Sequence, residues 1–197
     1  MEQLKNEKLT VTISAHGAEL QSIKNAEGRE YLWQGDEKYW PRRSPLLFPI
    51  VCGLWKDEYR VDGRTFNLPR HGFARDMDFE VVEKSDTSVT YTLESSPETR
   101  EVYPYDFELD VTYILNDDAI SVIWSVKNTG KQEMHFQIGG HPAFNLPGVA
   151  EGDKMHGSIL FDNVEPLTRI IGNTGGCIKP ERYELKTDRQ VWNFDEE

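Results

Sequence analysis

Residues 107–127 read FELDVTYILNDDAISVIWSVK, two mainly alternating runs of apolar and polar residues on either side of the polar turn Asn116-Asp117-Asp118. Successive side chains of a β-strand point to opposite faces of its sheet, so a period of two gives each run one apolar face. The pattern predicts a β-hairpin with strands at 107–115 and 119–127. The hairpin is expected to end at Asn128-Thr129-Gly130, a strong turn signal.

The same period of two recurs through the first half of the chain. It predicts further strands at residues 9–13, 19–23, 59–61, 64–66, 79–84 and 88–94. Asp62-Gly63 lies between two of these strands and favours a tight hairpin, because both positions of such a turn need positive φ. The only segment that tolerates a helix is 95–102. The chain is therefore predicted to be an all-β antiparallel sandwich, folded as a single domain over residues 1–197.

Charge and cysteine content narrow the class of protein. A formal net charge of -12 argues against binding to a nucleic-acid backbone, which needs clustered Lys and Arg. Cys52 and Cys177 form neither a C-x-x-C pair nor a disulfide framework. No signal peptide follows Met1, and nowhere do about 20 apolar residues run together. These features predict a soluble, cytoplasmic protein with reduced thiols and without nucleic-acid or membrane partners.

Two stretches break the strand pattern. Residues 40–55 read WPRRSPLLFPIVCGLW, and their three prolines make a regular central strand improbable because proline lacks a backbone donor. Residues 139–148 read GGHPAFNLPG. Loops of unusual chemistry on a rigid β scaffold are where functional sites usually lie. Both stretches are therefore predicted to carry the site.

Two of the five histidines are candidates for chemistry. His71 and His141 lie in segments whose backbone is restrained by neighbouring glycine and proline, which suits a positioned proton donor. A structural histidine that is hydrogen-bonded within a loop fits these positions equally well. His16 and His156 are expected to be exposed turn residues, and His135 is expected on a strand face. No histidine pair has zinc-ligand spacing, and no serine-nucleophile or phosphate-loop motif occurs, so neither a metal nor a cofactor is predicted.

Three motifs together resemble the aldose 1-epimerase family. They are RSPLLFPIV at 43–51, HGFARD at 71–76 and GHPAFN at 140–145, and the branch that they resemble most is the LacX-like group. The likeness runs from the first strand to about residue 170, with the motifs in the family's order. It implies a β-supersandwich of the galactose mutarotase type and an enzyme that interconverts the anomers of a free sugar.

The resemblance also implies roles for individual residues. In this family a carboxylate base takes the proton of the anomeric hydroxyl while a histidine acid protonates the ring oxygen. His141 would be the acid, and His71 would hydrogen-bond the substrate near the ring oxygen. Arg43, Arg75 and Asn145 would contact the sugar or order the site. Their partner would be an aldohexose or its phosphate.

Aromatic and basic residues near the first motif add to this expectation. Most of the aromatic cluster is expected in the core, while one or two members could stack on a sugar ring; the cluster comprises Tyr31, Trp33, Tyr39, Trp40, Phe48 and Trp55. Arg42 and Arg43 are either solvated charges or donors to sugar hydroxyls. The aromatic neighbourhood favours the second reading for Arg43.

The chain departs from the family pattern in two places. Cys52-Gly53 stands where many relatives carry Gly-Arg, so a sugar-binding arginine is expected to be missing. The family's base is a glutamate on a late strand, and Glu196 and Glu197 do not lie in its motif, so neither is assigned that role. The chain is expected to lack the carboxy-terminal strands. Sheet edges would then be exposed. Either the chain is a truncated form, or its edges pair with a second copy in a homodimer.

Three other functions remain open from the sequence. The missing base favours a carbohydrate-binding module without turnover. The HGFAR segment is shared with related hexose-6-phosphate epimerases, so a phosphorylated substrate is possible. A purely structural β domain of a larger glycosidase is the third alternative.

Overall fold

The computed structural model describes residues 1–146, 148–149, 152, 157–162, 167–172, 178–185 and 190–193. His156, Cys177, Glu196 and Glu197 lie outside this set. The chain divides into two compact units, Met1–Asn145 and Leu146–Glu197, which are described one at a time. The single domain expected over residues 1–197 stays a prediction.

The first unit is built from short antiparallel strands. They are β1 (Glu2–Lys5), β2 (Leu9–Ile13), β3 (Leu20–Asn25), β4 (Leu46–Leu47), β5 (Glu58–Val61), β6 (Arg64–Asn67), β7 (Glu80–Lys84), β8 (Ser88–Glu94), β9 (Phe107–Asn116), β10 (Ala119–Asn128) and β11 (Gly139–Gly140). One short helix, α1 (Pro97–Val102), falls where the sequence tolerates it. Among the described helices, none has the length and apolar character needed to cross a lipid bilayer.

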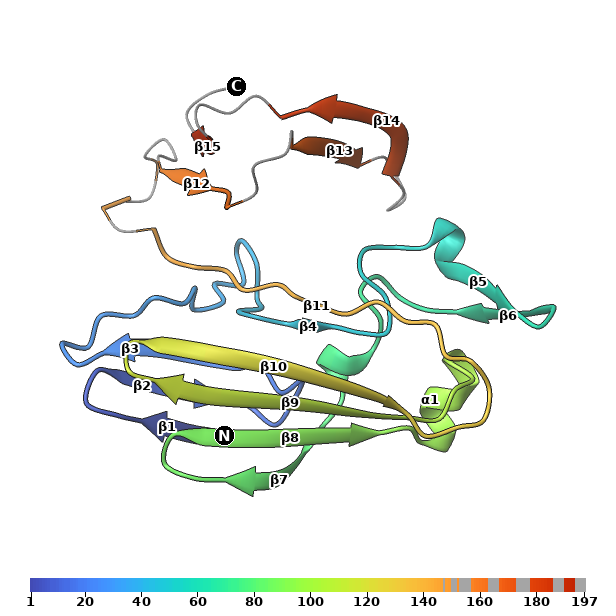
Figure 1. Cartoon of the computed structure of the whole chain (residues 1–197), viewed down its shortest axis with the longest axis horizontal. Coiled ribbons are helices and arrows are strands. Elements are labelled where there is room, and N and C mark those ends of the chain that lie inside the picture. The colour runs from blue at the N-terminus through green and yellow to red at the C-terminus, as the bar shows by residue number, and fades with distance from the viewer. Residues whose placement is uncertain are drawn as a thin grey trace. The chain divides into compact units, whose positions relative to one another are not determined.

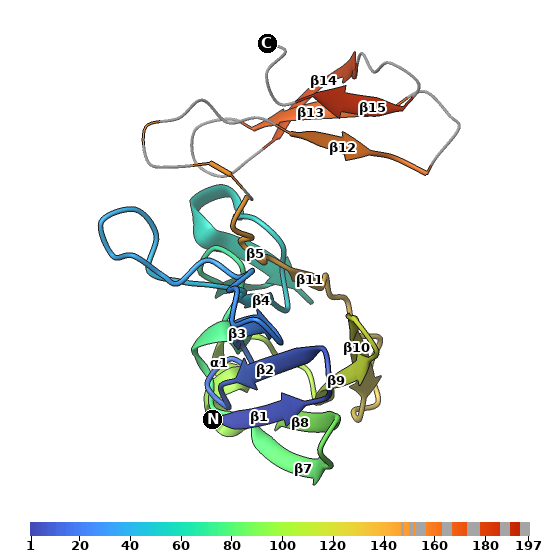
Figure 2. The same cartoon turned by 90° about the vertical axis from the view of Figure 1, so that its left-hand side faces the viewer.

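Two sheets make up the body of this unit (Figures 1 and 2). The blue strands form a sheet of order β1-β2-β3, and the green to yellow strands form one of order β10-β9-β8-β7. β5 pairs with β6, and β4 pairs with β11. The all-β antiparallel fold predicted from the alternating pattern is confirmed.

The predicted hairpins are also confirmed, nearly to the residue. β9 and β10 pair from Asn116↔Ala119 to Phe107↔Asn128 around the expected polar turn. The β5–β6 hairpin turns at Asp62 and Gly63, whose φ values are 49° and 77°. Both are positive, as the tight turn requires.

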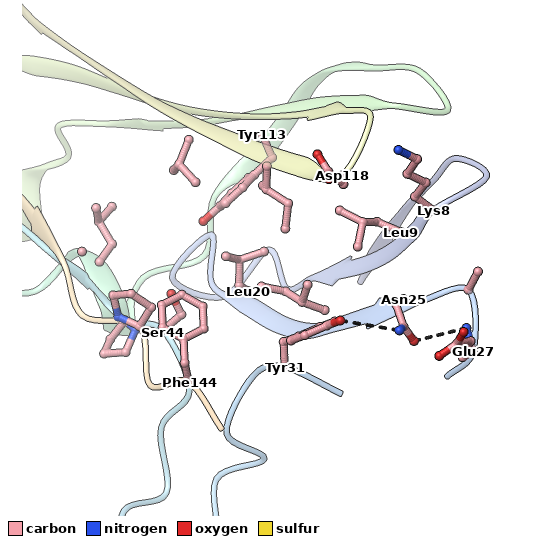
Figure 3. A pocket seen from close by; sticks show the side chains of 18 of the residues that line it. Lys8, Leu9, Leu20, Asn25, Glu27, Tyr31, Ser44, Tyr113, Asp118 and Phe144 are labelled. Carbon is pink, nitrogen blue, oxygen red and sulfur yellow. Dashed lines mark hydrogen bonds between the residues drawn. The ribbon is translucent and has the colours of Figure 1, made fainter. Parts of the chain in front are cut away.

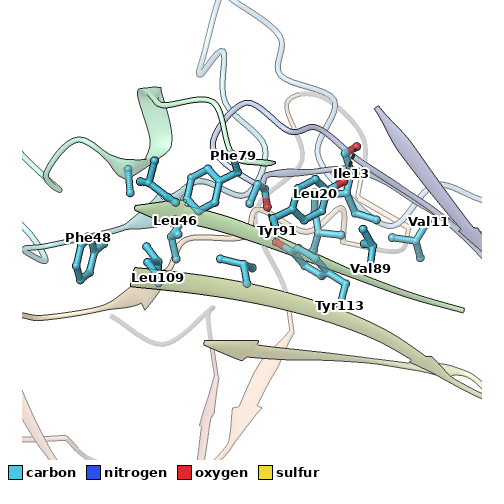
Figure 4. Close-up of a cluster of buried hydrophobic side chains, with 14 of the residues drawn as sticks. Val11, Ile13, Leu20, Leu46, Phe48, Phe79, Val89, Tyr91, Leu109 and Tyr113 are labelled. Carbon is cyan, nitrogen blue, oxygen red and sulfur yellow. Dashed lines mark hydrogen bonds between the residues drawn. The ribbon is translucent and has the colours of Figure 1, made fainter. Parts of the chain in front are cut away.

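The hydrophobic core lies between the two sheets (Figure 4). Alternate residues of β2 and β9 are buried, which places one face of each strand inward. The hydroxyl of Tyr113 on β9 donates to the carbonyl oxygen of Ala18 at 2.7 Å, and burial raises the pKa of that hydroxyl. Because a buried hydroxyl needs a partner, this bond ties β9 to the loop between β2 and β3.

Two irregular segments run side by side and carry the candidate site. The backbone N–H groups of Gln137, His141 and Ala143 donate to the carbonyl oxygens of Pro49, Pro45 and Arg43 at 2.9, 3.1 and 2.9 Å. The short β4–β11 pair lies within this ladder. As expected from its three prolines, residues 40–55 form no long strand. The ladder brings the first and third sequence motifs together.

The second unit contains two strand pairs in its described part. β12 (Ser158–Leu160) pairs with β15 (Val191–Asn193), and β13 (Thr168–Gly172) pairs with β14 (Ile178–Glu184). All pairings are antiparallel, in keeping with the first unit.

Two predictions about individual side chains are wrong. The aromatic cluster is not mostly core: Phe48 is fully buried, but Tyr39 and Trp55 are 57% and 65% exposed. Tyr and Trp carry O–H and N–H groups that can hydrogen-bond to water, so a cluster of them can remain at the surface. His135 lies in the loop between β10 and β11 rather than on a strand face, because the strand has already ended at Asn128.

Candidate active site

His71 and His141 come from distant parts of the sequence and meet in the structure. Their ring centroids lie 6.0 Å apart with the planes at 68°, an edge-to-face arrangement. His71 precedes a 3₁₀ turn at Ala74–Asp76, and His141 directly follows β11. The structure therefore brings together the two histidines singled out by the sequence.

The ring of His71 is held by the backbone of Cys52. The Cys52 N–H donates to Nδ1 of His71 at 3.0 Å, and the His71 N–H donates to the Cys52 carbonyl at 2.9 Å. Because Nδ1 accepts, a neutral His71 carries its proton on Nε2. Burial lowers the pKa of His71 below its ordinary value, and the nearby charges of Arg75 and His141 lower it further. His71 is thus a neutral hydrogen-bond donor at pH 7.

His141 is placed differently. Its backbone is fixed by the bond to Pro45, while its side chain is exposed and packs against Trp40, with ring centroids 5.1 Å apart. Within the described ranges, no hydrogen bond reaches either ring nitrogen. Both nitrogens of His141 are therefore open to a ligand.

Three arginines, Arg42, Arg70 and Arg75, lie near enough for their charges to act on His71. Arg75 donates from Nη2 to the Arg70 carbonyl at 2.8 Å, and Arg42 donates from Nη2 to Oδ1 of Asp76 at 2.7 Å. Nε of Arg75 is buried without a hydrogen-bond partner, since Oδ2 of Asp76 lies 3.6 Å away. Burial lowers the pKa of Arg75, and Arg42 adds to the effect. Positive charge exceeds negative charge around this ring.

Arg43 turns toward β3 instead of His71. Its Nη1 donates to Oε1 of Gln21 at 2.7 Å, and Oε1 of Glu19 accepts the backbone N–H groups of Arg43 and Ser44 at 3.0 and 2.8 Å. These contacts anchor the segment that leads into β4. These contacts are consistent with a role of Arg43 in ordering the site. A contact between Arg43 and the sugar stays a prediction.

Asn145 likewise ties loops together. Its side-chain amide donates to the carbonyls of Leu32 at 3.0 Å and Glu30 at 3.3 Å, and its backbone N–H donates to Tyr31. The contacts hold residues 143–145 against residues 30–33. Its predicted role in binding substrate stays a prediction.

Trp40 was expected only as one of six aromatic residues that could lie in the core or stack on a sugar, and Cys52 and Asp76 were given no role at the site. Trp40 contacts His141, Cys52 holds His71 through its backbone, and Asp76 pairs with Arg42. Arg42 was considered only as the weaker alternative to Arg43. Their position in the sequence could have indicated them, because each of these residues lies within or beside one of the three motifs.

The first unit also contains a cavity beside segments 44–46 and 140–144. It has a volume of about 950 Å³ and opens between β2–β3 and β9–β10 (Figure 3). Its walls are mainly apolar, and Leu20, Tyr113 and Phe144 are among the side chains drawn there. None of the five predicted site residues lines it.

The histidine pair can supply one mobile proton and one fixed hydrogen bond. Asp76, the carboxylate beside it, is paired with arginines. In the described residues no group of three His, Cys, Asp or Glu side chains is arranged to hold a metal ion. The geometry supports proton donation to a neutral or anionic oxygen compound.

Comparison with known proteins gives matches over most of the chain. The family model described as aldose 1-epimerase matches residues 2–160. The chromosomal and plasmid forms of Protein LacX from Lactococcus lactis subsp. lactis are each 42% identical over 171 residues, covering 83% of this chain and 56% of the relative. The chain thus spans about half the length of the curated relatives it matches.

Solved structures agree with this result. A galactose mutarotase related enzyme from Lactobacillus acidophilus has a TM-score of 0.86 at 36% identity, covering 97% of this chain and 64% of that one. A galactose mutarotase-like protein from Lactobacillus casei ATCC 334 has a TM-score of 0.84 at 37% identity, covering 94% of this chain and 67% of that one. These structures confirm the mutarotase-like β-sandwich implied by the sequence motifs.

Proposed function

The chain belongs to the aldose 1-epimerase family, and from this we propose that it acts in the interconversion of the α and β anomers of an aldohexose. The observation that carries the proposal is the pairing of His71 and His141 in unlike states. One ring has a tautomer fixed by Cys52, and the other has both nitrogens open. This is the division of labour expected when one group orients an oxygen atom and another transfers a proton to it.

The proposed reaction needs an acid and a base. His141 gives a proton to the ring oxygen as the bond from that oxygen to the anomeric carbon breaks. A carboxylate base takes the proton of the anomeric hydroxyl, which becomes the aldehyde. Rotation about the bond between the first two carbons and the reverse proton transfers close the ring on either face. His71 donates a hydrogen bond from Nε2 to the oxygen that His141 protonates.

The proposal assigns the acid side of the reaction to this chain. No residue of this chain is assigned as the carboxylate base, and the chain covers 56% of LacX. Near the histidines, Asp76 is engaged with two arginines and makes a poor base. General acid catalysis by a positioned histidine typically contributes about 10²–10⁴-fold.

Saturation-transfer NMR tests the proposal on a panel of free aldohexoses and their 6-phosphates. Saturating the anomeric proton of one anomer is expected to reduce the signal of the other faster than in buffer alone. Sugar binding without accelerated exchange would support the carbohydrate-binding alternative instead. If no monosaccharide binds, both proposals fail.

A phosphorylated aldose is the second candidate substrate, because of the arginines beside His71. Arg42, Arg70 and Arg75 outnumber the single carboxylate of Asp76, and Nε of Arg75 is buried without a partner. A phosphate group would pair with such guanidinium groups through charge-assisted hydrogen bonds. The acidity of the whole chain does not oppose this, since the local charge is positive.

Replacing Arg70 tests this candidate with little risk to the fold, because Arg70 is exposed and only its carbonyl is used structurally. Arg70→Gln is expected to raise KM for a hexose 6-phosphate by about tenfold, the effect of one charge-assisted hydrogen bond, and to leave KM for the free hexose unchanged. Arg60→Gln, at an exposed position on β5, is the control. Equal effects on both sugars would contradict a phosphate contact.

A further inference from the structure

Among the described residues, the acid of the proposed reaction has no hydrogen-bonded partner that orients its ring. His71 is fixed by Cys52, but in the part of the chain that the structure describes His141 is fixed only at its backbone. A histidine that transfers a proton must still be aimed, because a misplacement of about 1 Å can cost about 10²-fold in rate. Some other contact must therefore hold the ring of His141.

Trp40 makes that contact from a rigid turn. The backbone N–H groups of Tyr39 and Trp40 donate to the Asp36 carbonyl at 3.0 and 2.9 Å. The carbonyl of Trp40 in turn accepts the indole N–H of Trp33 at 2.8 Å. The Trp33 backbone N–H donates to Ala143, two residues after His141. Trp40 and His141 are thus connected through a short chain of hydrogen bonds as well as by their rings.

The ring contacts place His141 between two aromatic neighbours. Trp40 lies 5.1 Å away with its plane tilted by 42°, and His71 lies 6.0 Å away edge to face. Among the ring contacts of the described residues there is no pair of Trp40 with His71. Trp40 and His71 thus each contact the ring of His141 without forming a ring contact with each other.

We infer that Trp40 is a positioning residue for His141, orienting the acid by ring packing where a hydrogen-bonding side chain would otherwise do so. The inference rests on the proposed function. A carboxylate bonded to one nitrogen would commit that nitrogen to a proton and favour one tautomer. An aromatic face restrains the ring and leaves both nitrogens available, so His141 can give a proton and take it back during one cycle.

Kinetics of Trp40 variants test the inference. Trp40→Ala is expected to lower kcat for anomer exchange by about ten- to hundredfold through misplacement of His141, with KM changed by less than about twofold. Trp40→Phe keeps an aromatic face and is expected to restore kcat to within about threefold. Trp55→Ala, at a tryptophan that is 65% exposed, is the matched control and is expected to change neither constant.

Other outcomes would overturn the inference. A rise in KM with unchanged kcat would make Trp40 a surface that stacks on the sugar, and failure of Trp40→Phe to restore kcat would remove ring packing as the cause. The ring-proton resonances of His141 provide a readout that does not depend on turnover. They are expected to shift in Trp40→Ala and to stay in place in Trp55→Ala.

The NMR readout separates the inference from the proposed function. If the unmodified protein exchanges no aldose anomers, the proposed function fails, and the resonances still decide whether Trp40 restrains His141. If exchange occurs but the resonances do not move in Trp40→Ala, the inference fails and the function stands.

Discussion

Gly72→Ala is expected to lower the free energy of unfolding by about 3–5 kcal/mol, the range of severe single substitutions. A Cβ atom at this position would lie 2.2 Å from the carbonyl oxygen of Phe48, 2.5 Å from its carbonyl carbon and 2.6 Å from the nitrogen of Pro49. All three are backbone atoms, so no side-chain rotation relieves the clash. The φ of +70° at Gly72 adds a cost of roughly 1–2 kcal/mol for any residue with a Cβ.

The backbone cannot move aside cheaply because Phe48 is anchored in the core. Its side chain is fully buried, and its carbonyl accepts the N–H groups of Phe73 at 3.1 Å and Ala74 at 3.2 Å. Its own N–H donates to the His71 carbonyl at 3.2 Å. A shift that made room for the new methyl group would break these bonds or lift Phe48 from the core. It would also displace His71, the residue before Gly72.

Gly63→Ala is the matched control, measured with Gly72→Ala by thermal and urea unfolding followed by circular dichroism. Gly63 has nearly the same φ, +77°, but nothing lies within 4 Å of its Cβ position. Gly63→Ala is expected to lower the free energy of unfolding only by the cost of positive φ, about 1–2 kcal/mol. Equal losses in the two variants would show that the close approach to Phe48 contributes nothing.

Local pattern was sufficient to predict the regular part of the fold. The β9–β10 hairpin follows from alternation and a polar turn, both of which are contained in one stretch of sequence. The ladder of residues 137–143 against 43–49 could not be predicted in this way. It consists of isolated long-range hydrogen bonds around prolines, and no alternation of apolar and polar residues marks it in the sequence.

The same ladder explains why the site was predicted in part. Arg42 and Arg43 are neighbours in an irregular segment, and their side chains reach different partners, Asp76 and Gln21. The backbone of this segment is held where Pro45 and Arg43 accept the N–H groups of His141 and Ala143. Arg42 is the one of the two whose charge acts on His71. The contact between Arg43 and sugar, which the aromatic neighbourhood favoured, stays a prediction. The motifs identified the loops, but the partners of the side chains within them depend on long-range contacts that the motifs do not specify.

His141→Asn is expected to slow anomer exchange by about 10²–10⁴-fold relative to the unmodified protein, the usual contribution of a general acid. Asparagine is similar in size and can hydrogen-bond an oxygen, but it cannot give up a proton at neutral pH. Because the side chain of His141 is exposed and its backbone bond to Pro45 is retained, stability should change by less than about 0.5 kcal/mol. Polarimetry of a freshly dissolved single anomer measures the rate.

His135→Asn is the control for this experiment. His135 is also exposed and lies in the segment between β10 and β11. Its carbonyl accepts the Tyr103 hydroxyl at 2.9 Å, and its side chain is not used in that bond. Its replacement should leave the rate unchanged. A His141→Asn protein that exchanged anomers as fast as the control would exclude His141 as the acid. The reaction would then need another proton donor. His71 would be the next residue to replace, because Cys52 holds its Nδ1 and leaves its Nε2–H free to donate.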